Sequence, residues 1–487
     1  MIQLPLAKAF SQTNAYASQS AYKLLPFRFL RYDENRYLVT NLVGEFLMLG
    51  SDDFKAFVGR TLPTDTSLFH DLKGKHFLFD DVSDAALELL ATKYRTKQSL
   101  LSNFTALHMF VTSLRCDHSC PYCQVSRVSE DRSAFDMSEE TASRAIDLMF
   151  KSPSPVLKVE FQGGESLLNF GLVKYIVREA KRRNDGRHLE FVIATNLSPL
   201  TDEILEFCRE HSILISTSLD GPEELHNANR PRPGRDSHQR ATRGIERVRQ
   251  YLGRDRVSAL MTTTAKSLTM PREIIDEYLR MGFRSIFLRP ISPYGFALKS
   301  AAKIGYQTDA FLEFYRTGLQ YILELNKQGI PMREEYAAII LGKMLTPYPS
   351  GYVDLQSPSG IGITCIIYNY DGDVYASDEG RMLAENKDYT FRLGNVRDNS
   401  YEEIIALSPL LPMIYETMAE GTPQCTDCAY LPWCGTDPVF HHATQGDVVG
   451  HRPTSDYCIR NMGVFRTILD LMESDPTAKT IMRRWAR

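Results

Sequence analysis

The sequence lacks the features that would indicate a membrane protein, a secreted protein or a nucleic-acid binder. Its 487 residues contain no apolar run long enough to span a bilayer. Residues 1–20 have neither a basic flank nor an apolar core, so we expect no signal peptide. There is no internal repeat and no low-complexity tract, and the net charge is only −4. These absences predict a cytoplasmic globular protein with no membrane or nucleic-acid partner.

Cysteine is present in a pattern that indicates metal or redox chemistry. The chain has nine cysteines within an ordinary globular balance of 43% hydrophobic and 24% charged residues. In a cytoplasmic chain, metal or redox sites come before disulfides as an explanation. Eight of the cysteines fall between Cys116 and Cys123 or between Cys365 and Cys458. The ninth, Cys208, lies in a helical pattern, and we expect it to be a small core residue.

Residues 1–82 predict a small N-terminal domain. Residues 22–50 alternate like strands separated by polar turns, and two helical patterns follow at Ser51–Gly59 and Thr66–Lys73. Residues 83–104 predict a helical connector with Ser83 as its N-cap.

Residues 105–307 change to a regular alternation of strands and helices. Six such units predict an α/β fold, a parallel sheet wound as a partial (β/α)6 barrel, with its chemistry at the carboxyl ends of the strands. Residues 308–351 predict a helical bridge, and 352–487 hold the remaining cysteines among short strands, turns and a closing helix at Val464–Glu473. The predicted barrel strands are Thr105–Thr112, Leu157–Phe161, Leu189–Ala194, Ile213–Leu219, Val257–Thr263 and Ser285–Leu288.

Three cysteines, Cys116, Cys120 and Cys123, follow the first of these strands. Three thiolates on one loop can hold three irons of a four-iron cluster, which leaves the fourth iron open for a substrate or cosubstrate. A zinc knuckle would arrange its ligands as two pairs. The alternative is a set of three buried or zinc-bound cysteines with a structural role.

Two polar segments follow later strands. Phe161–Ser166 follows the second strand, and its two glycines lack side chains that would keep a ligand away from the backbone. Glu165 adds an acceptor for an ammonium group. Ser216–Pro222 ends the fourth strand and leads into His226–Pro231. Taken singly, each of these residues can also be a turn residue or a surface charge.

In this order, the motifs resemble those of the radical S-adenosylmethionine (SAM) enzymes. The resemblance implies that the three cysteines hold a [4Fe–4S] cluster whose open iron takes the methionine end of SAM. It also implies that Glu165 and its neighbours hold the amino group, that Tyr122 lies near the adenine, and that Ser218 and Arg230 meet the ribose and carboxylate. The residues expected to bind SAM are Tyr122, Gln162, Gly163, Gly164, Glu165, Ser166, Ser218, Asp220 and Arg230.

The C-terminal cysteines resemble the SPASM extension of the same superfamily. Cys425, Cys428 and Cys434 have the spacing C-x2-C-x5-C, and Cys458 is the distant fourth. Four thiolates close a metal site. The resemblance therefore implies one auxiliary [4Fe–4S] cluster that is structural or transfers electrons and does not bind substrate.

A second auxiliary site departs from this pattern. Cys365 fits its first ligand, but Ser377 and Pro438 stand where two further cysteines belong. One thiolate cannot hold a cluster, so we expect a single auxiliary cluster unless Asp378 or Asp437 supplies oxygen ligands. Resemblance to the sulfatase-maturating members implies instead that Asp378 is a catalytic general base. A plain turn aspartate is the third interpretation.

Within the superfamily, the whole chain is similar to the B-type maturases of the His-Xaa-Ser peptide system. Pro26–Phe29, Tyr37–Glu45 and the cysteine loop carry this match. It implies an enzyme that crosslinks or otherwise functionalises a C–H bond of a ribosomal precursor peptide, of the His-Xaa-Ser repeat type. The other implied partners are a companion radical SAM maturase and an electron donor such as flavodoxin or ferredoxin. Residues 1–82 would bind the peptide leader as a strand added to a sheet edge.

Two alternatives stay open. One is a radical SAM enzyme with a SPASM extension that modifies a protein cysteine or serine, as sulfatase maturases do, or a small molecule. The other is a non-enzymatic iron–sulfur or zinc adaptor. An adaptor would not cleave SAM, whereas both kinds of enzyme would.

Overall fold

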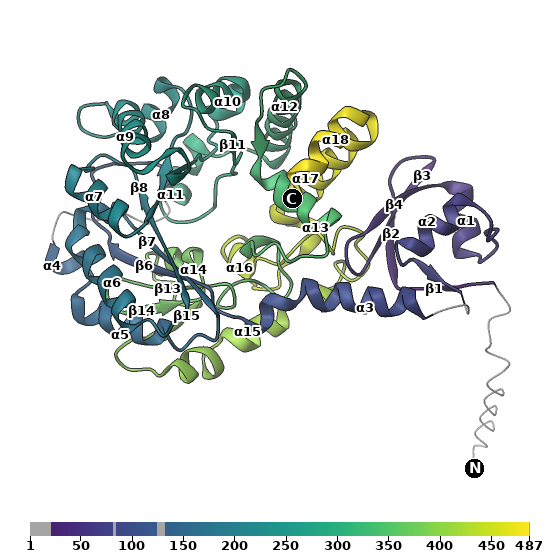
Figure 1. The fold of residues 1–487 in the computed structure, drawn as a ribbon, viewed down its shortest axis with the longest axis horizontal. Helices are drawn as coiled ribbons and strands as arrows, with labels where there is room; N and C mark the ends of the chain where they lie inside the picture. Colours follow the sequence, from purple (N-terminus) through teal and green to yellow (C-terminus); the bar gives the residue numbers. More distant parts are fainter. Residues whose placement is uncertain (1–20, 81–83, 124–131, 487) are drawn as a thin grey trace, which may run out of the picture. The chain divides into compact units, whose positions relative to one another are not determined.

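The computed structural model describes residues 21–80, 84–123 and 132–486 (Figure 1). The chain divides into two compact units. Unit 1 contains the N-terminal residues up to Lys97 together with Asp427–Pro432, and unit 2 contains Gln98–Thr426 and Trp433–Arg487. In the described part of the chain, no helix combines the length and the apolar character needed to cross a membrane.

Unit 1 is built on an antiparallel sheet of three strands in the order β2-β3-β4. Its core contains the fully buried side chains of Val39, Phe57, Leu72 and Phe77. The three predicted strands and two predicted helices are confirmed. Ser83, the predicted N-cap of the connector helix, lies outside the described residues. The elements are β1 (Lys23–Leu24), β2 (Phe27–Arg31), β3 (Arg36–Asn41), β4 (Phe46–Gly50), α1 (Ser51–Val58), α2 (Ser67–Gly74), β5 (Leu78–Phe79) and α3 (Ala85–Lys97).

The three-stranded sheet has two outer strands. Among the described residues, β2 and β4 each pair with β3 alone. Phe29 of β2 is 49% exposed, and its ring lies against the rings of Phe54 and Tyr37. The outer side of such a strand presents backbone N–H and C=O groups to which another strand can be added.

A segment from the C-terminal half of the chain completes unit 1. The hydroxyl of Thr40 in β3 donates a 2.7 Å hydrogen bond to the carbonyl oxygen of Ala429. Ala429, Tyr430 and Leu431 are all buried. The residues between two of the predicted auxiliary-cluster cysteines therefore fold with the N-terminal strands.

Unit 2 is organised around an eight-stranded sheet in the order β10-β9-β8-β7-β6-β13-β14-β15. Helices connect its parallel strands, so the predicted α/β fold with a mostly parallel central sheet is confirmed. The parallel strands are β6 (Leu107–Ser113), β7 (Val156–Gly163), β8 (His188–Thr195), β9 (Leu214–Ser218), β10 (Val257–Leu260) and β13 (Cys365–Tyr368). The antiparallel strands at one edge are β14 (Asp373–Tyr375) and β15 (Arg392–Asn395).

The sixth predicted strand is shorter than expected. It forms β11 (Ser285–Ile286), which pairs in parallel with β12 (Arg333–Glu334) and not with β10. The N–H of Thr263 donates to the Arg289 carbonyl at 2.9 Å, so the loops after β10 and β11 are joined by a backbone hydrogen bond. On the other side of the sheet, β13 adds to β6, with Cys365 opposite Leu107.

Several helices of unit 2 begin with a side-chain N-cap. The Ser138 hydroxyl accepts a hydrogen bond from the N–H of Thr141, and the Thr201 hydroxyl accepts one from that of Ile204. Cys208 is 1% exposed, which confirms it as a core residue. The helices are α4 (Arg132–Phe135), α5 (Glu139–Met149), α6 (Phe170–Arg183), α7 (Asp202–Glu210), α8 (Glu223–Asn229), α9 (Ser237–Leu252), α10 (Pro271–Arg280), α11 (Phe296–Ile304), α12 (Thr308–Lys327), α13 (Glu335–Leu345), α14 (Asp378–Ala384), α15 (Leu410–Glu416), α16 (Pro438–Gln445), α17 (Asp456–Ser474) and α18 (Pro476–Trp485).

Candidate functional site

The cysteine loop starts at the carboxyl end of the parallel sheet. β6 and β7 end side by side, with Ser113 opposite Gly163, and Cys116 follows directly after β6. Cys116, Cys120 and Cys123 are half-buried and form no disulfide. The N–H of Cys123 donates to the Cys120 carbonyl at 3.1 Å, which closes a turn between the last two cysteines. The fold thus places three thiols where chemistry is expected in this architecture.

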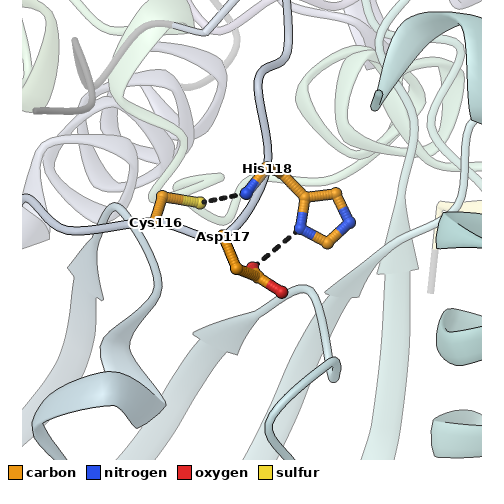
Figure 2. Close-up of side chains that lie close together, drawn as sticks. All are labelled: Cys116, Asp117 and His118. Atoms are coloured by element: carbon orange, nitrogen blue, oxygen red, sulfur yellow. Dashed lines mark hydrogen bonds and ion pairs between the residues drawn. The ribbon is translucent and has the colours of Figure 1, made fainter. Parts of the chain in front are cut away.

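A hydrogen-bond network holds the loop in place. The imidazole of His118 is hydrogen-bonded at Nδ1 to the Asp117 carboxylate, at 2.8 Å (Figure 2). Its Nε2 is hydrogen-bonded to the Ser237 hydroxyl, at 2.9 Å. The Asn196 amide donates to the same Asp117 carboxylate at 2.8 Å. Ligand atoms of Cys116, Asp117 and His118 lie within 4.8 Å of one another. Because both imidazole nitrogens already have partners, Asp117 and His118 position the loop, and the thiols are the available metal ligands.

The surroundings of Cys116 and Cys120 favour binding of a metal by these thiols. Burial raises the pKa of the Cys116 thiol far above its usual range and that of the Cys120 thiol to about 12. A neutral thiol is a poor ligand, so the positive charge of a metal is needed to keep such groups as thiolates. Thiolate charge on Cys120 also raises the pKa of Cys116, and that on Cys123 raises the pKa of Cys120. The donors are therefore close enough to share one cluster.

Gly163, the last residue of β7, and Gly164 are required by a close backbone contact that the sequence did not reveal. A Cβ on Gly163 would lie 2.0 Å from the Ser113 carbonyl oxygen, and one on Gly164 would lie 2.2 Å from that of Arg115. Gly163 also has a φ of 141°. These glycines let the end of β7 pack directly on the backbone that begins the cysteine loop. Close approach to another segment of the chain, as well as to a ligand, therefore accounts for them.

Glu165 is buried under this loop and is held by three donors. Its carboxylate accepts hydrogen bonds from the hydroxyl of Thr195, at 2.6 Å, and from the N–H groups of Asn196, at 2.7 Å, and Leu167, at 3.0 Å. Burial nevertheless raises its pKa to about 7. A carboxylate with so little solvation gains from a cationic partner, which is consistent with the predicted contact to an ammonium group.

Three of the predicted SAM-binding residues contact one another. The hydroxyl of Tyr122 donates to the Asp220 carboxylate at 2.5 Å, and Nε of Arg230 donates to the same oxygen at 3.2 Å. The Arg230 guanidinium lies 5.4 Å from the centre of the Tyr122 ring. Its charge also lowers the pKa of the Cys120 thiol. Tyr122, Asp220 and Arg230 thus form a single polar group beside the cysteine loop.

The remaining predicted contacts lie on neighbouring strand ends. Gln162 of β7 donates its side-chain amide to the Glu160 carboxylate at 2.8 Å, and the Ser166 hydroxyl donates to the Ala194 carbonyl at 3.1 Å. Ser218 is half-buried at the end of β9. The predicted residues therefore gather at the carboxyl ends of β6, β7 and β9. The sequence did not indicate Asp117, His118 or Asn196, because no spacing pattern links them to their partners.

Comparison with known proteins identifies this constellation. The family described as the radical SAM superfamily matches residues 110–277. An uncharacterised protein of Methanothermobacter thermautotrophicus is 31% identical over 194 residues, which make up 40% of this chain and 69% of the relative. The chain belongs to the radical SAM superfamily. A radical SAM enzyme uses a [4Fe–4S] cluster and SAM. A cysteine-type anaerobic sulfatase-maturating enzyme of Clostridium perfringens is 22% identical over 338 residues, which are 66% of this chain and 84% of the relative.

Solved structures share the fold. Native anSMEcpe with bound AdoMet has a TM-score of 0.63 at 16% identity, over 78% of this chain and 99% of that chain. Streptococcus suis SuiB bound to precursor peptide SuiA has a TM-score of 0.53 at 14% identity, over 90% of this chain and 99% of that chain. The fold of this radical SAM enzyme is thus shared with anSMEcpe and with SuiB.

The auxiliary cysteines of the radical SAM enzyme lie beside buried cations. Burial raises the pKa of the Cys425 and Cys434 thiols. The charge of Arg452 lowers the pKa of both thiols, and thiolate charge on Cys434 raises that of Cys425. Arg452 is buried, and its Nε and one Nη have no hydrogen-bond partner among the described residues. Lys343 donates to the Cys434 carbonyl at 2.8 Å. A thiolate-ligated cluster is anionic, so unpartnered cationic N–H groups beside these thiols fit such a cluster.

The other two auxiliary cysteines occupy different elements. Cys458 lies in the first turn of α17, where the Ser455 hydroxyl caps the helix. Cys428 belongs to the segment Asp427–Pro432 of unit 1. The four-thiolate set of Cys425, Cys428, Cys434 and Cys458 stays a prediction.

Residues at the predicted second auxiliary site form the starts of two helices. Ser377, at one missing cysteine position, accepts the N–H of Gly380 and caps α14. Pro438, at the other, is the first residue of α16, where Asp437 caps the helix by accepting the N–H of Phe440 at 2.9 Å. Cys365 is buried, with its thiol 3.7 Å from the Ala376 carbonyl oxygen. These residues are satisfied by the protein itself, which favours a single auxiliary cluster.

Asp378 begins a helix and is not part of a loose turn. It is the first residue of α14, and its carboxylate accepts a hydrogen bond from Nε of the buried Arg381 at 3.3 Å. A carboxylate in the first turn of a helix is stabilised as the anion by the helix dipole. The structure therefore gives Asp378 a partner in Arg381 of the same helix, and the catalytic role stays a prediction.

Proposed function

We propose that this chain is a radical SAM maturase that modifies a ribosomally made precursor peptide by a crosslink or a related C–H functionalisation. The observation that carries the proposal is that one chain combines the radical SAM constellation with an N-terminal sheet whose outer strand, β2, has an exposed aromatic residue. Peptides bind to such edges as added strands. SuiB, whose fold is similar, has been solved with precursor peptide SuiA, and this supports a peptide partner.

In this proposal the chain's residues hold and orient the reacting groups. Cys116, Cys120 and Cys123 bind the cluster, and the SAM contacts predicted above bind the cosubstrate. When bound, these groups supply a 5'-deoxyadenosyl radical, which removes a hydrogen atom from an unactivated C–H bond. The peptide radical then gives up one electron, which the auxiliary cluster held by Cys425, Cys428, Cys434 and Cys458 would accept, and one proton as its new bond forms. Asp378 accepts that proton, and an external carrier such as flavodoxin or ferredoxin supplies the electron that starts the cycle.

The proposal assigns a task to each region. Residues 1–82 bind the leader, and residues 83–104 form a helical connector to the radical SAM barrel of residues 105–307. Residues 308–351 form a helical bridge from the barrel to residues 352–487, which hold the auxiliary cluster. The sequence match to the B-type maturases of the His-Xaa-Ser system favours a substrate of that repeat type and a companion radical SAM maturase on the same peptide. The work would take place in the cytoplasm.

A second candidate is modification of a cysteine or serine in a protein, as in sulfatase maturation. The observation that favours it is Asp378, which follows Ser377 at the position of the base in those enzymes. The Clostridium perfringens sulfatase-maturating relative aligns over 84% of its own length, which also supports this candidate.

Two peptides distinguish the candidates. The anaerobically reconstituted enzyme is incubated with SAM, reductant and either a precursor peptide of the His-Xaa-Ser repeat type or a sulfatase peptide that carries cysteine or serine. We expect loss of hydrogen from the precursor alone, with 5'-deoxyadenosine formed in parallel. A formylglycine in the sulfatase peptide, with an unchanged precursor, would replace the first candidate by the second. The Cys116→Ala/Cys120→Ala/Cys123→Ala variant is the control.

A further inference from the structure

Unit 2 contains a cavity that the sequence motifs do not explain. It is partly open to solvent, and the centres of water-sized molecules can occupy about 50 Å3 of it. Three half-buried carboxylates line it, those of Asp354, Glu379 and Asp437. Glu379 is the second residue of α14, and Asp437 caps α16. The starts of these two helices, at the predicted second auxiliary site, therefore each place an acid in the lining of the cavity.

Acidic side chains outnumber basic ones in the lining of this cavity. Three acids share it with the guanidiniums of Arg289 and Arg460, and the charge of Arg460 offsets part of the effect of burial on Asp437. The Arg460 guanidinium also lies over the ring of Phe440, 5.5 Å from its centre. Burial and the neighbouring acids raise the pKa of Glu379 to about 8, and burial and Asp354 raise that of Asp437 to about 7. Groups in this condition gain from a cation placed among them.

An unpartnered polar group points to a ligand in the same cavity. Tyr294 lines it and is 2% exposed, yet its hydroxyl has no hydrogen-bond partner among the described residues. Buried hydroxyls are normally satisfied, so a missing partner is expected to come from a bound molecule. The phenol oxygen can accept a hydrogen bond from a cationic N–H.

Aromatic rings form another wall of the cavity. The rings of Phe287 and Tyr336 are stacked, with centroids 5.5 Å apart and an interplanar angle of 12°. Tyr352 lies 6.1 Å from Phe287 and 6.0 Å from Tyr336. Faces of aromatic rings attract organic cations, and rings combined with carboxylates recognise them specifically. An inorganic ion fits less well, because among the described residues only Cys116, Asp117 and His118 bring metal-type ligand atoms within 4.8 Å of one another.

We infer that this cavity binds a cationic side chain, a guanidinium or an ammonium, of the peptide substrate. The inference rests on the proposed function, because the cationic side chain belongs to the peptide that the maturase is proposed to modify. The maturase would recognise this side chain in addition to the residue that is modified. The cavity is close to the radical site: Ile291 in its wall packs with Tyr122 and Cys120 of the cysteine loop. The acids hold the charge, the rings flank it, and Tyr294 accepts an N–H.

Direct titration tests this inference. The reconstituted enzyme with SAM is titrated by calorimetry with four probes: N-acetyl-arginine methylamide, its lysine analogue, its uncharged near-isostere N-acetyl-citrulline methylamide, and N-acetyl-glutamate methylamide. We expect an arginine or lysine probe to bind at least about tenfold more tightly than citrulline, because a charge-assisted contact is lost in citrulline. Equal affinities would overturn the inference. Tighter binding of the glutamate probe would also overturn it, because the two arginines would then define the site.

Isosteric variants connect the binding to the named groups. Glu379→Gln should weaken the cationic probe about tenfold and leave citrulline unchanged, and Tyr294→Phe should weaken both probes several-fold. Glu402→Gln removes an exposed acid elsewhere in unit 2 and should change neither. Melting temperatures and iron contents equal to wild type show that a variant is folded. Unchanged probe affinity in folded Glu379→Gln and Tyr294→Phe would refute the assignment.

Binding and turnover are measured on the same preparation, so the two proposals fail separately. Selective binding of the cationic probe without modification of the precursor would end the proposed function and support the cavity assignment. Modification of the precursor without a preference for cationic probes would end the cavity assignment alone.

Discussion

The hydroxyl of Thr40 donates a 2.7 Å hydrogen bond to the carbonyl oxygen of Ala429, although the two residues are 389 positions apart in the chain. Both groups are buried. Residues 429–432, which follow Cys428, are therefore part of the unit that contains the proposed leader-binding sheet. Deletion of residues 1–82 would uncover Ala429, Tyr430 and Leu431, and loss of activity in such a truncation would not isolate leader binding. A point substitution on the outer strand is the sharper test.

Phe29→Asp should weaken recognition of the leader. Phe29 lies on the outer strand β2 and is 49% exposed, so a carboxylate there costs little folding energy but disfavours an apolar peptide strand. We expect modification of the full-length precursor at limiting peptide to fall about tenfold, equivalent to about 1.4 kcal/mol of binding. Modification of a core peptide without leader should not change. Leu87→Asp on α3, at 44% exposure, is the matched control. Equal losses in both variants would count against a leader site at β2.

The cysteine loop sets the iron content. With one open and one closed site, the reconstituted chain should hold about eight irons, and changing Cys116, Cys120 and Cys123 to alanine should leave about four. That variant should form no 5'-deoxyadenosine. Residual SAM cleavage would contradict the assignment of the radical cluster. A wild-type content of about twelve irons would show that the Cys365 region holds a further cluster despite its helix caps.

Asp378→Asn should separate hydrogen abstraction from product formation. A base is needed only after the C–H bond is broken, and general base catalysis contributes about 10²–10⁴-fold. We expect 5'-deoxyadenosine to form in the presence of peptide, with little modified peptide. Asparagine also retains an acceptor for Nε of Arg381 and the first-turn position in α14, so the helix should persist. Normal product yield would leave Asp378 with its contact to Arg381 alone, and loss of iron would make it a cluster ligand.

Glu334 should make stability depend on pH. It is fully buried, and its carboxylate accepts hydrogen bonds from the Tyr315 hydroxyl at 2.7 Å and the Leu288 N–H at 3.1 Å. Burial raises its pKa from 4.5 in the unfolded chain to about 7. The folded state therefore binds this proton more tightly than the unfolded state does. The resulting stabilisation of the folded state is complete below pH 4.5 and is lost as the pH rises through 7. From this group alone the free energy of unfolding should fall by about 3 kcal/mol over that window.

Urea unfolding at a pH on either side of this window, in wild type and in Glu334→Gln, checks the effect. The glutamine does not titrate, so the difference between the two pH values should shrink in the variant. An identical pH dependence in both proteins would show that Glu334 does not titrate in this range.

The sequence predicted well wherever the information is local. Ser138 and Thr201 are residue types that commonly cap helices, and each precedes a helix. Cys116, Cys120 and Cys123 lie in one loop. The partners of His118 were not predictable, because Asn196 and Ser237 reach it only through the packing of separate βα units. The same is true of Glu379 and Tyr294, which meet at a cavity through tertiary structure. Gly163 and Gly164 were predicted for the right place but without their main reason, since the segment they pack on is visible only in the fold.

The central claim is that a radical formed at this site takes hydrogen from a peptide. A precursor peptide of the His-Xaa-Ser repeat type, produced in deuterated medium, is incubated with reconstituted enzyme and unlabelled SAM, and the 5'-deoxyadenosine is analysed by mass spectrometry. The account predicts that 5'-deoxyadenosine carries one deuterium per modification event and that the peptide loses the corresponding label. Unlabelled 5'-deoxyadenosine formed together with a modified peptide would contradict it, as would an unmodified peptide in a preparation that cleaves SAM.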